Sequence, residues 1–290
     1  MRFFIIDVFG EKRYSGNQLA TFLSNGEMSQ GEMQSIAREI NFSETTFIIS
    51  DQERNGGFDV RIFTPGEEIP FAGHPTLGTA YVIDKHLRQG MKERVILNLQ
   101  IGQVPVTFDE ANDVLWMKQR APEFGRVLDA RPVAEALGLS LDDIDPSWPI
   151  EEVSTGLPQI IIPLKSLSRL KAIKIDKERS GDLMRRNWGQ TLVAFTSEAY
   201  MEDESIAVRV FPAPWHGISE DPATGSGNGC LAAYLVKHRF FEMDHIDLRA
   251  GQGYEVGRPS KLYLKARANS EGIEVEVGGK VIQVAEGRWE

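Results

Sequence analysis

Apolar residues along this chain recur mostly as short runs or in alternation with polar residues, a period of two that is typical of β-strands. Strand-like segments are spread over the whole length, for example at 3–8, 45–49, 58–63, 192–195 and 207–211. Segments with the 3.6-residue period of a helix are fewer. The pattern therefore predicts a protein in which strands predominate.

Helices are predicted at five places, two of which have no polar face. Ser29 and Glu32 form a capping box that starts one amphipathic helix. Other helices are expected to start at Pro75 and to cover 229–238, with shorter ones near 132–138 and 176–188. The runs 77–83 and 230–236 are apolar all round, so we expect each to be a buried helix inside a wrapped sheet, one in each half of the chain.

Similar phrases recur in the two halves of the chain at offsets of 148 or 149 residues. Such a near-constant, long offset predicts a duplicated domain, although short strand phrases with glycine and proline also recur in ordinary α+β proteins. Under duplication we expect three pairs of equivalent positions: Phe47 with Phe195, Arg61 with Arg209, and Gly102 with Gly251.

The domain boundary is expected near 120–123, after the last strand of the first copy. The prediction is an N-terminal domain over 1–120 and a C-terminal domain over 121–279. The final strand, 280–290, is expected to cross back to the first domain.

Composition limits the partners and the compartment. The 290 residues suffice for two domains, and a net charge of −10 argues against nucleic acid or an anionic membrane as partner. Cys230 is the single cysteine, which excludes an intrachain disulfide and fits a reducing cytoplasm. The apolar run near Met1 is too short for a signal peptide or a membrane span. We therefore expect a cytoplasmic protein.

Each half also places polar and glycine residues directly before its apolar helix, at 71–80 and at 220–229. A helix N-terminus carries unsatisfied N–H groups and partial positive charge, and it therefore suits an anion. Two facing helix starts would bind a small acidic molecule between two domains.

Glu44 is the candidate proton-transfer residue. It stands where a helix gives way to a strand, beside β-branched and aromatic residues, and partial burial suits a group that moves protons near neutral pH. The second half has no acid at the matching place, where Gln190 and Thr191 stand. A glutamate at such a helix end can equally lie on the surface without a role, and the sequence leaves both interpretations open.

Four other residues belong to the candidate site. His74 sits at or beside a helix N-cap, either as an acid, base or donor or as a packed capping residue. Asp221 reads most simply as an N-cap. Ser226 lies within 224–227, whose amides could form an anion-binding nest. Asn17 either contacts the substrate or occupies a turn.

These motifs together match a known family in order and spacing over essentially the whole chain. They are Gly16 with Asn17, Ser43 to Thr45, residues 63–65 with 70–75, residues 220–226, Gly251 to Gly253, and residues 257–260. The chain resembles the PhzF-like phenazine biosynthesis family. Gln18 departs from the family pattern, which often has proline after Gly-Asn.

The resemblance implies a diaminopimelate-epimerase-like α+β fold, with two pseudo-symmetric domains that each wrap a β-barrel-like sheet around a central helix. It also implies an isomerase that needs no cofactor or metal, acts on a small, cyclic, acidic substrate, and forms a homodimer. Glu44 would be the acid and base. His74, Asp221 and Ser226 would assist, and backbone amides near Gly73 and Gly225 would hold the substrate carboxylate.

Two other functions compete with this one. A protein that binds a small molecule or a partner without catalysis would keep the same pocket, although the intact set of polar residues favours an enzyme. An epimerase using Glu44 with a second base would need an opposite partner, for which Asp221 is the candidate. A racemase with two thiols is excluded, because Cys230 is the only cysteine.

Overall fold

The computed structural model describes residues 1–24, 26, 28–88, 90 and 94–290. The chain divides into two compact units: unit 1 comprises 1–118 with 278–290, and unit 2 comprises 119–277. Among the described residues, no helix has the length and apolar character needed to cross a membrane.

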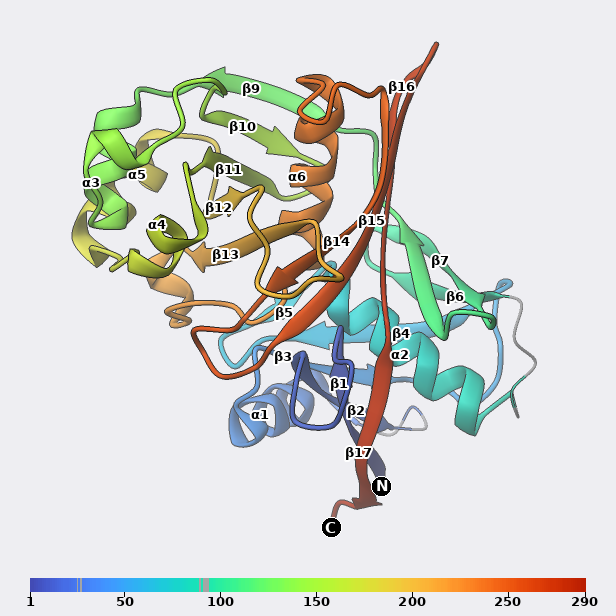
Figure 1. The fold of residues 1–290 in the computed structure, drawn as a ribbon. Helices are drawn as coiled ribbons and strands as arrows, with labels where there is room; N and C mark the ends of the chain where they lie inside the picture. The colour runs from blue at the N-terminus through green and yellow to red at the C-terminus, as the bar shows by residue number, and fades with distance from the viewer. Residues whose placement is uncertain (25, 27, 89, 91–93) are drawn as a thin grey trace. The chain divides into compact units, whose positions relative to one another are not determined.

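The described part of unit 1 contains two helices among its strands (Figure 1). In chain order its elements are β1 (Arg2–Val8), β2 (Asn17–Leu23), α1 (Gln30–Ile40), β3 (Glu44–Ile48), β4 (Phe58–Phe63), β5 (Glu68–Ile69), α2 (Gly73–His86), β6 (Arg94–Leu99), β7 (Gly102–Asp109), β8 (Val114–Lys118) and, from the C-terminus, β17 (Val281–Arg288).

Unit 2 has more helices than the described part of unit 1. Its elements are β9 (Glu123–Val127), α3 (Ala130–Leu137), η1 (Leu141–Asp143), β10 (Glu151–Ser154), β11 (Pro158–Pro163), α4 (Leu167–Ala172), α5 (Lys177–Arg186), β12 (Thr191–Thr196), β13 (Ile206–Pro212), η2 (Pro214–His216), α6 (Gly225–Lys237), β14 (His245–Gln252), β15 (Ser260–Asn269) and β16 (Gly272–Gly279).

The two units repeat one strand topology. In unit 1, β1 is antiparallel to β2, β2 parallel to β3, β3 antiparallel to β4, β4 parallel to β6, and β6 antiparallel to β7. In unit 2, β10 to β15 follow the same sequence of orientations. Each first strand also has an antiparallel neighbour on its other side, β17 beside β1 and β9 beside β10. The predicted fold class is thereby confirmed.

Strand register corrects two of the three predicted equivalences. Arg61 lies opposite Phe47 in unit 1, and Arg209 lies opposite Ala194 in unit 2. If the two arginines correspond, Phe47 corresponds to Ala194, one residue before Phe195. The side chains agree, since Phe47 belongs to the core cluster of α1 whereas Phe195 stacks edge-on against Tyr234 of α6.

The pair Gly102 and Gly251 is wrong for a different reason. Gly102 begins β7, whereas Gly251 lies near the end of β14, which corresponds to β6. The offset is not constant, because connections in the two units differ in length. It is 148 between Arg61 and Arg209 but 152 between Gly73 and Gly225, the first residues of α2 and α6.

The two apolar helices are the central helices of their units, as expected. Helix α2 packs against β1, β2, β3, β6, β7 and β8, and α6 against β10, β11, β12, β14 and β15. Small residues permit close packing: a Cβ at Gly78 would lie 2.7 Å from Ile6 Cδ1. Both helices begin earlier than predicted, α2 at Gly73 and α6 at Gly225, because tertiary packing overrides the low helix propensity of glycine.

Amphipathic helices cover the outer faces. In unit 1, Met33 and Ala37 of α1 pack on Phe22 and Phe47, and the predicted capping box of Ser29 is present. In unit 2, α3 and α5 cover the face of the strands opposite to α6 (Figure 1). This layering leaves the inner faces of the strands to α2 and α6.

Candidate functional site

Three candidate residues of unit 1 come from the starts of three different elements. Asn17 is the first residue of β2, Glu44 the first of β3, and His74 the second of α2. Strands β2 and β3 are parallel, with Leu19 beside Glu44, so both strands begin at the same edge. Helix α2 starts at that edge, and the topology brings the three side chains together.

The side chains of Asn17, Glu44 and His74 lie close together, but Nε2 of His74 makes no hydrogen bond with the described residues. Nε2 of His74 lies 3.3 Å from Oε2 of Glu44, and Nδ1 of His74 lies 3.3 Å from Nδ2 of Asn17. Both side chains of the first pair are largely covered, with 6% of His74 and 17% of Glu44 exposed. Nε2 of His74 is buried and not aligned for a hydrogen bond with any group in the described part of the chain. A substrate atom placed there would meet a ring nitrogen and a carboxylate together.

His74 is neutral in this environment. Burial lowers the pKa of His74 to about 3, and a hydrogen bond with the backbone of Gln18 opposes the lowering only in part. The contact with Glu44 is therefore not an ion pair. The Asn17 amide beside Nδ1 and the hydrogen bond with the Gln18 backbone hold the ring in place, with Nε2 turned toward Glu44.

Gly16 explains how Asn17 reaches this position. Its φ of 73° is in the left-handed region, and a Cβ there would lie 2.3 Å from the carbonyl oxygen of Val8. Only glycine permits so tight an entry into β2. Asn17 itself lies in the strand, 2% exposed, and so it is not the turn residue that one interpretation of the sequence suggested.

Unit 2 brings together the other candidates around the start of α6. Gly225 and Ser226 are the first two residues of the helix, and both are buried. Asp221 is not the N-cap: that residue is Thr224, whose hydroxyl donates to the Asp221 carboxylate. Asp221 instead forms an isolated bridge with Val210 of β13, which fixes its backbone.

The N-terminal turns of α2 and α6 share one property. Neither Ala72 nor Thr224, the two N-caps, makes a side-chain capping hydrogen bond. The first N–H groups of an α-helix have no partner within the helix, and they suit an anionic group. Gly73 and Gly225 are the residues at which these N–H groups begin.

Gln252 was not singled out from the sequence as a functional residue. Its fully buried side chain bonds to Thr224, Asn228 and the backbone of Asp221. The available signal was the phrase Gly251-Gln252-Gly253, which was noticed only as a family motif. A polar residue between two glycines at a strand end is a frequent sign of a close backbone approach.

Two other kinds of catalytic group, a reactive thiol and a cluster of metal ligands, are not found in the part of the chain that the structure describes. Burial raises the pKa of the Cys230 thiol to about 12, so this cysteine is a packed side chain and not a nucleophile. Among the described residues, no three His, Cys, Asp or Glu side chains are grouped as metal ligands.

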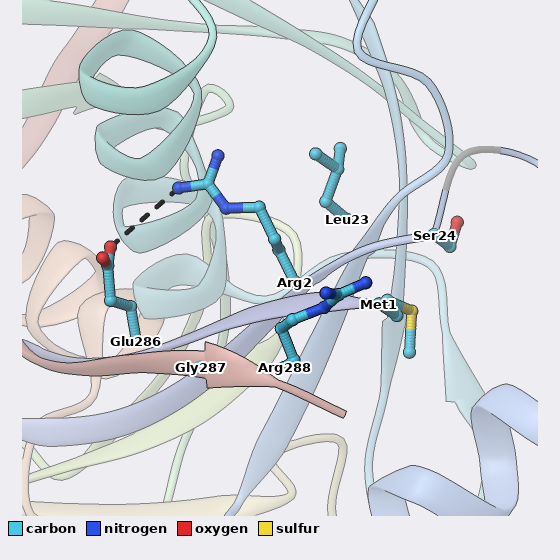
Figure 2. A pocket seen from close by; sticks show the side chains of 7 residues that line it. All are labelled: Met1, Arg2, Leu23, Ser24, Glu286, Gly287 and Arg288. Atoms are coloured by element: carbon cyan, nitrogen blue, oxygen red, sulfur yellow. Dashed lines mark ion pairs between the residues drawn. The ribbon is translucent and has the colours of Figure 1, made fainter. Parts of the chain in front are cut away.

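A cavity of about 770 Å³ in unit 1 is separate from the Glu44–His74 pair. Figure 2 shows its lining by both chain ends, with Arg2 paired to Glu286 at 3.9 Å. Leu23 lines it from the last position of β2, whereas Asn17 occupies the first. A strand of that length spans roughly 20 Å, so the cavity lies at the far end of β2.

Known proteins resemble this chain over its full length. The family model for phenazine biosynthesis-like protein, PhzC-PhzF, matches residues 6–287. A trans-2,3-dihydro-3-hydroxyanthranilate isomerase from Pseudomonas aeruginosa is 33% identical over 99% of this chain and 98% of its own length. An uncharacterized isomerase from Clostridium acetobutylicum is 34% identical over 96% of this chain and 94% of its own.

Solved structures of related proteins show the same fold. A phenazine biosynthesis protein of the PhzF family from Bacillus anthracis matches with a TM-score of 0.91 at 27% identity, covering 99% of this chain and 98% of that one. A hydroxyproline epimerase from Agrobacterium vitis matches with a TM-score of 0.63 at 9% identity, covering 99% and 90% of the two chains, and so shares the fold alone. The chain belongs to the phenazine biosynthesis-like PhzC-PhzF family and, like its named relatives, is an isomerase.

Proposed function

We propose that this isomerase moves a proton within a small cyclic carboxylic acid, with Glu44 as the general acid and base. The observation that carries the proposal is the Glu44–His74 contact, a carboxylate oxygen 3.3 Å from a buried, neutral imidazole nitrogen. A pair of groups held at this spacing in a covered place suits proton transfer to and from a bound substrate.

In the proposed reaction, the Glu44 carboxylate takes a proton from one substrate carbon. The electrons of the broken C–H bond shift the neighbouring double bond by one position. The same carboxyl group then returns the proton to the carbon at the far end of that system. Atoms and charge balance, no electron is gained or lost overall, and a carboxylate is sufficient for the step without a cofactor or a metal.

His74 assists as a neutral donor in this proposal. Its Nε2 faces the same space as Glu44 and carries the ring proton in this proposal, and the pKa of about 3 keeps the ring uncharged over the working pH range. A neutral donor polarises a substrate oxygen or nitrogen without competing with Glu44 for the proton. Asn17 fixes the ring by its contact with Nδ1.

Binding is assigned to the helix starts. The N–H groups that begin at Gly73 and Gly225 suit the carboxylate of the substrate, and the Ser226 hydroxyl adds a donor. Asp221, with its carboxylate bonded to Thr224, suits a cationic or donor group such as a substrate amine. We further propose that the protein acts as a homodimer in the cytoplasm, with no nucleic-acid or membrane partner.

The first substrate to test is trans-2,3-dihydro-3-hydroxyanthranilate, because curated relatives at 33% identity are named as isomerases of that compound. It has the expected class, a cyclic acid with an amino group. Wild-type protein in D₂O should convert it without a net change of mass other than solvent deuterium on carbon. If the protein converts neither this compound nor related cyclic carboxylic acids, the proposed substrate class is wrong.

The role of Glu44 is tested by Glu44→Gln, which keeps size but cannot accept a proton at neutral pH. We expect turnover to fall by about 10²–10⁴-fold with substrate binding retained. The matched control is Glu39→Gln, the same change at an exposed position of α1, which should leave turnover unchanged. Full activity in Glu44→Gln would contradict the mechanism.

A further inference from the structure

The Gln252 side chain uses its whole hydrogen-bonding capacity on one short segment. Nε2 donates to the carbonyl oxygen of Asp221 at 2.7 Å and to Oγ1 of Thr224 at 3.2 Å. Oε1 accepts from the Thr224 backbone N–H at 3.3 Å and from Nδ2 of Asn228 at 2.8 Å. All partners lie between Asp221 and Asn228, the segment that carries the site residues of unit 2.

The strand backbone at this point touches the same segment. Gly253 follows Gln252 with φ 79°, and a Cβ there would lie 2.5 Å from the carbonyl oxygen of Pro222. The glycine therefore lets the end of β14 come into direct contact with the residue after Asp221. Both the side chain and the backbone of this motif are fitted to the loop before α6.

Asp221 is held from two sides. Its N–H donates to the carbonyl oxygen of Val210 at 3.0 Å, and its own carbonyl oxygen accepts from Gln252. The Thr224 hydroxyl, which contacts Gln252 Nε2, donates to the Asp221 carboxylate. The amide thus connects the backbone of Asp221, its carboxylate through Thr224, and the first turn of α6.

The scaffold does not require an amide at this strand position. The parallel pairing of β4 with β6 places Asp59 beside Asn98, and that of β13 with β14 places Ala207 beside Gly251. The residue after Asn98 is Leu99, so an apolar side chain occupies in unit 1 the place that Gln252 has in unit 2.

We propose that Gln252 is a positioning residue for the reaction: its amide sets the Asp221 carboxylate and the α6 N–H groups in the orientation that binds substrate. The inference rests on the proposed function, because Asp221 and Ser226 are the groups positioned. It assigns to Gln252 no contact with the substrate itself.

Two substitutions distinguish the donor role of the Gln252 amide from its acceptor role. Gln252→Met keeps the length and burial and removes all four hydrogen bonds. Gln252→Glu keeps an acceptor for Thr224 and Asn228 but loses the donor to Asp221, and a protonated carboxyl regains that donor. The matched control is Gln159→Met, a glutamine only 2% exposed whose Nε2 bonds to Leu157, two residues away.

The experiment measures kcat and KM for trans-2,3-dihydro-3-hydroxyanthranilate from pH 5 to 8. We expect Gln252→Met to lower kcat/KM by about 10²-fold at every pH, the loss typical of displaced positioning groups, and Gln159→Met to stay within a few-fold of wild type. Relative to wild type, Gln252→Glu should recover activity as the pH falls. A flat ratio, or equal losses in Gln252→Met and Gln159→Met, would overturn the proposal.

A second measurement keeps this inference separate from the proposed function. Hydrogen exchange of the amides of 225–227 should be at least 10-fold faster in Gln252→Met than in Gln159→Met. If wild type does not convert the compound, the proposed substrate fails and exchange alone decides the role of Gln252. If Gln252→Met does not fold, the pH dependence and the exchange rates of Gln252→Glu test the role of Gln252 instead. Amide exchange in Gln252→Glu that equals wild type at pH 8 would contradict the proposal.

Discussion

The two units share a strand order, yet their central helices begin among different side chains. With the strands aligned, Glu44, the first residue of β3, corresponds to Thr191, the first residue of β12. His74, the second residue of α2, corresponds to Ser226, the second residue of α6. The carboxylate and imidazole of unit 1 are thus replaced by two hydroxyls in unit 2.

The reverse holds on the adjoining strands. Asp221 bridges to Val210, whereas Ile69 pairs with Ile62 at the corresponding place in unit 1. At each of these three positions, an ionisable side chain is present in only one of the two units. The pair proposed to transfer the proton lies at the start of α2, and a hydrogen-bonded network lies at the start of α6.

Features kept in both copies belong to the scaffold instead. Arg61 pairs with Glu68 in unit 1, and Arg209 pairs with Glu220 in unit 2, each through two hydrogen bonds. The comparison therefore teaches which residues to test for function, namely those that differ, and which to test for stability, namely those that recur.

The largest effect is expected where the recurring ion pair is most buried. Arg209 and Glu220 have 8% and 9% of their side chains exposed, against 29% and 10% for Arg61 and Glu68. Arg209→Met should lower the free energy of unfolding by about 3–5 kcal/mol, since it leaves a buried carboxylate unpaired. Arg61→Met should cost about 1–2 kcal/mol.

Urea unfolding of both variants checks this, with Arg179→Met as control. Arg179 is 55% exposed in its pair with Glu135, and such a surface pair contributes less than about 1 kcal/mol. A larger loss in Arg61→Met than in Arg209→Met would show that burial does not set the strength of the shared pair.

The second prediction compares the two differing helix residues. His74→Gln should lower kcat by about 10²-fold, because it removes a donor beside the reacting group. Ser226→Ala should act mainly on KM, by roughly 10-fold, the equivalent of one lost hydrogen bond. His86→Gln, at the other end of α2 and bonded to Gln283, is the matched control. A larger kcat loss in Ser226→Ala would reverse the assignment of the two helix starts.

The third prediction concerns pH, since only unit 1 buries a histidine at its helix start. The pKa of His74 is about 3 when folded and about 6.5 when unfolded, so the unfolded chain binds more protons between these values. Stability should therefore fall as the pH drops below 6.5, by about 2 kcal/mol at pH 5. His74→Gln should remove this part of the acid sensitivity in urea unfolding, and an unchanged slope would show that His74 is not held neutral.

The fold class could be predicted from the sequence for a physical reason. Periodicity reports burial, so the fully apolar helices and the strand-rich pattern were readable directly. Glu44 was a candidate because it is ionisable and stands beside apolar residues, and His74 because it stands at a predicted helix start. The 3.3 Å distance between them could not be predicted from periodicity, since it depends on how α2 packs against β3.

Three other features could not be predicted from the sequence and became clear only from the fold. Asp221 looked like an N-cap because aspartate before proline is a common helix start, but Thr224 takes that role and leaves Asp221 to a bridge with β13. Phe195 looked equivalent to Phe47, but a shift of one residue turns a strand side chain to the opposite face. Gln252 was missed because all its partners lie 24 or more residues away.

The smallest effect is expected from a buried hydroxyl chain that only unit 1 has. Thr79 of α2 donates to Thr46 of β3 at 2.8 Å, and Thr46 donates to Thr21 of β2 at 2.9 Å, all without exposure. Val193 occupies the place of Thr46 in unit 2 and packs toward Gly227 of α6. Hydroxyls are thus not needed for a central helix to pack on its sheet.

Thr46→Val should lower the free energy of unfolding by about 1–2 kcal/mol, because it leaves the hydroxyls of Thr79 and Thr21 with one bond fewer in a buried place. Val193→Thr is the mirror control, and should cost a similar amount by burying a hydroxyl among apolar side chains. The row of hydroxyls could also hold α2 in register, so that His74 stays opposite Glu44. In that case Thr46→Val will lower kcat, while Val193→Thr will not. Equal kcat in the two variants would limit the hydroxyl chain to a stabilising role.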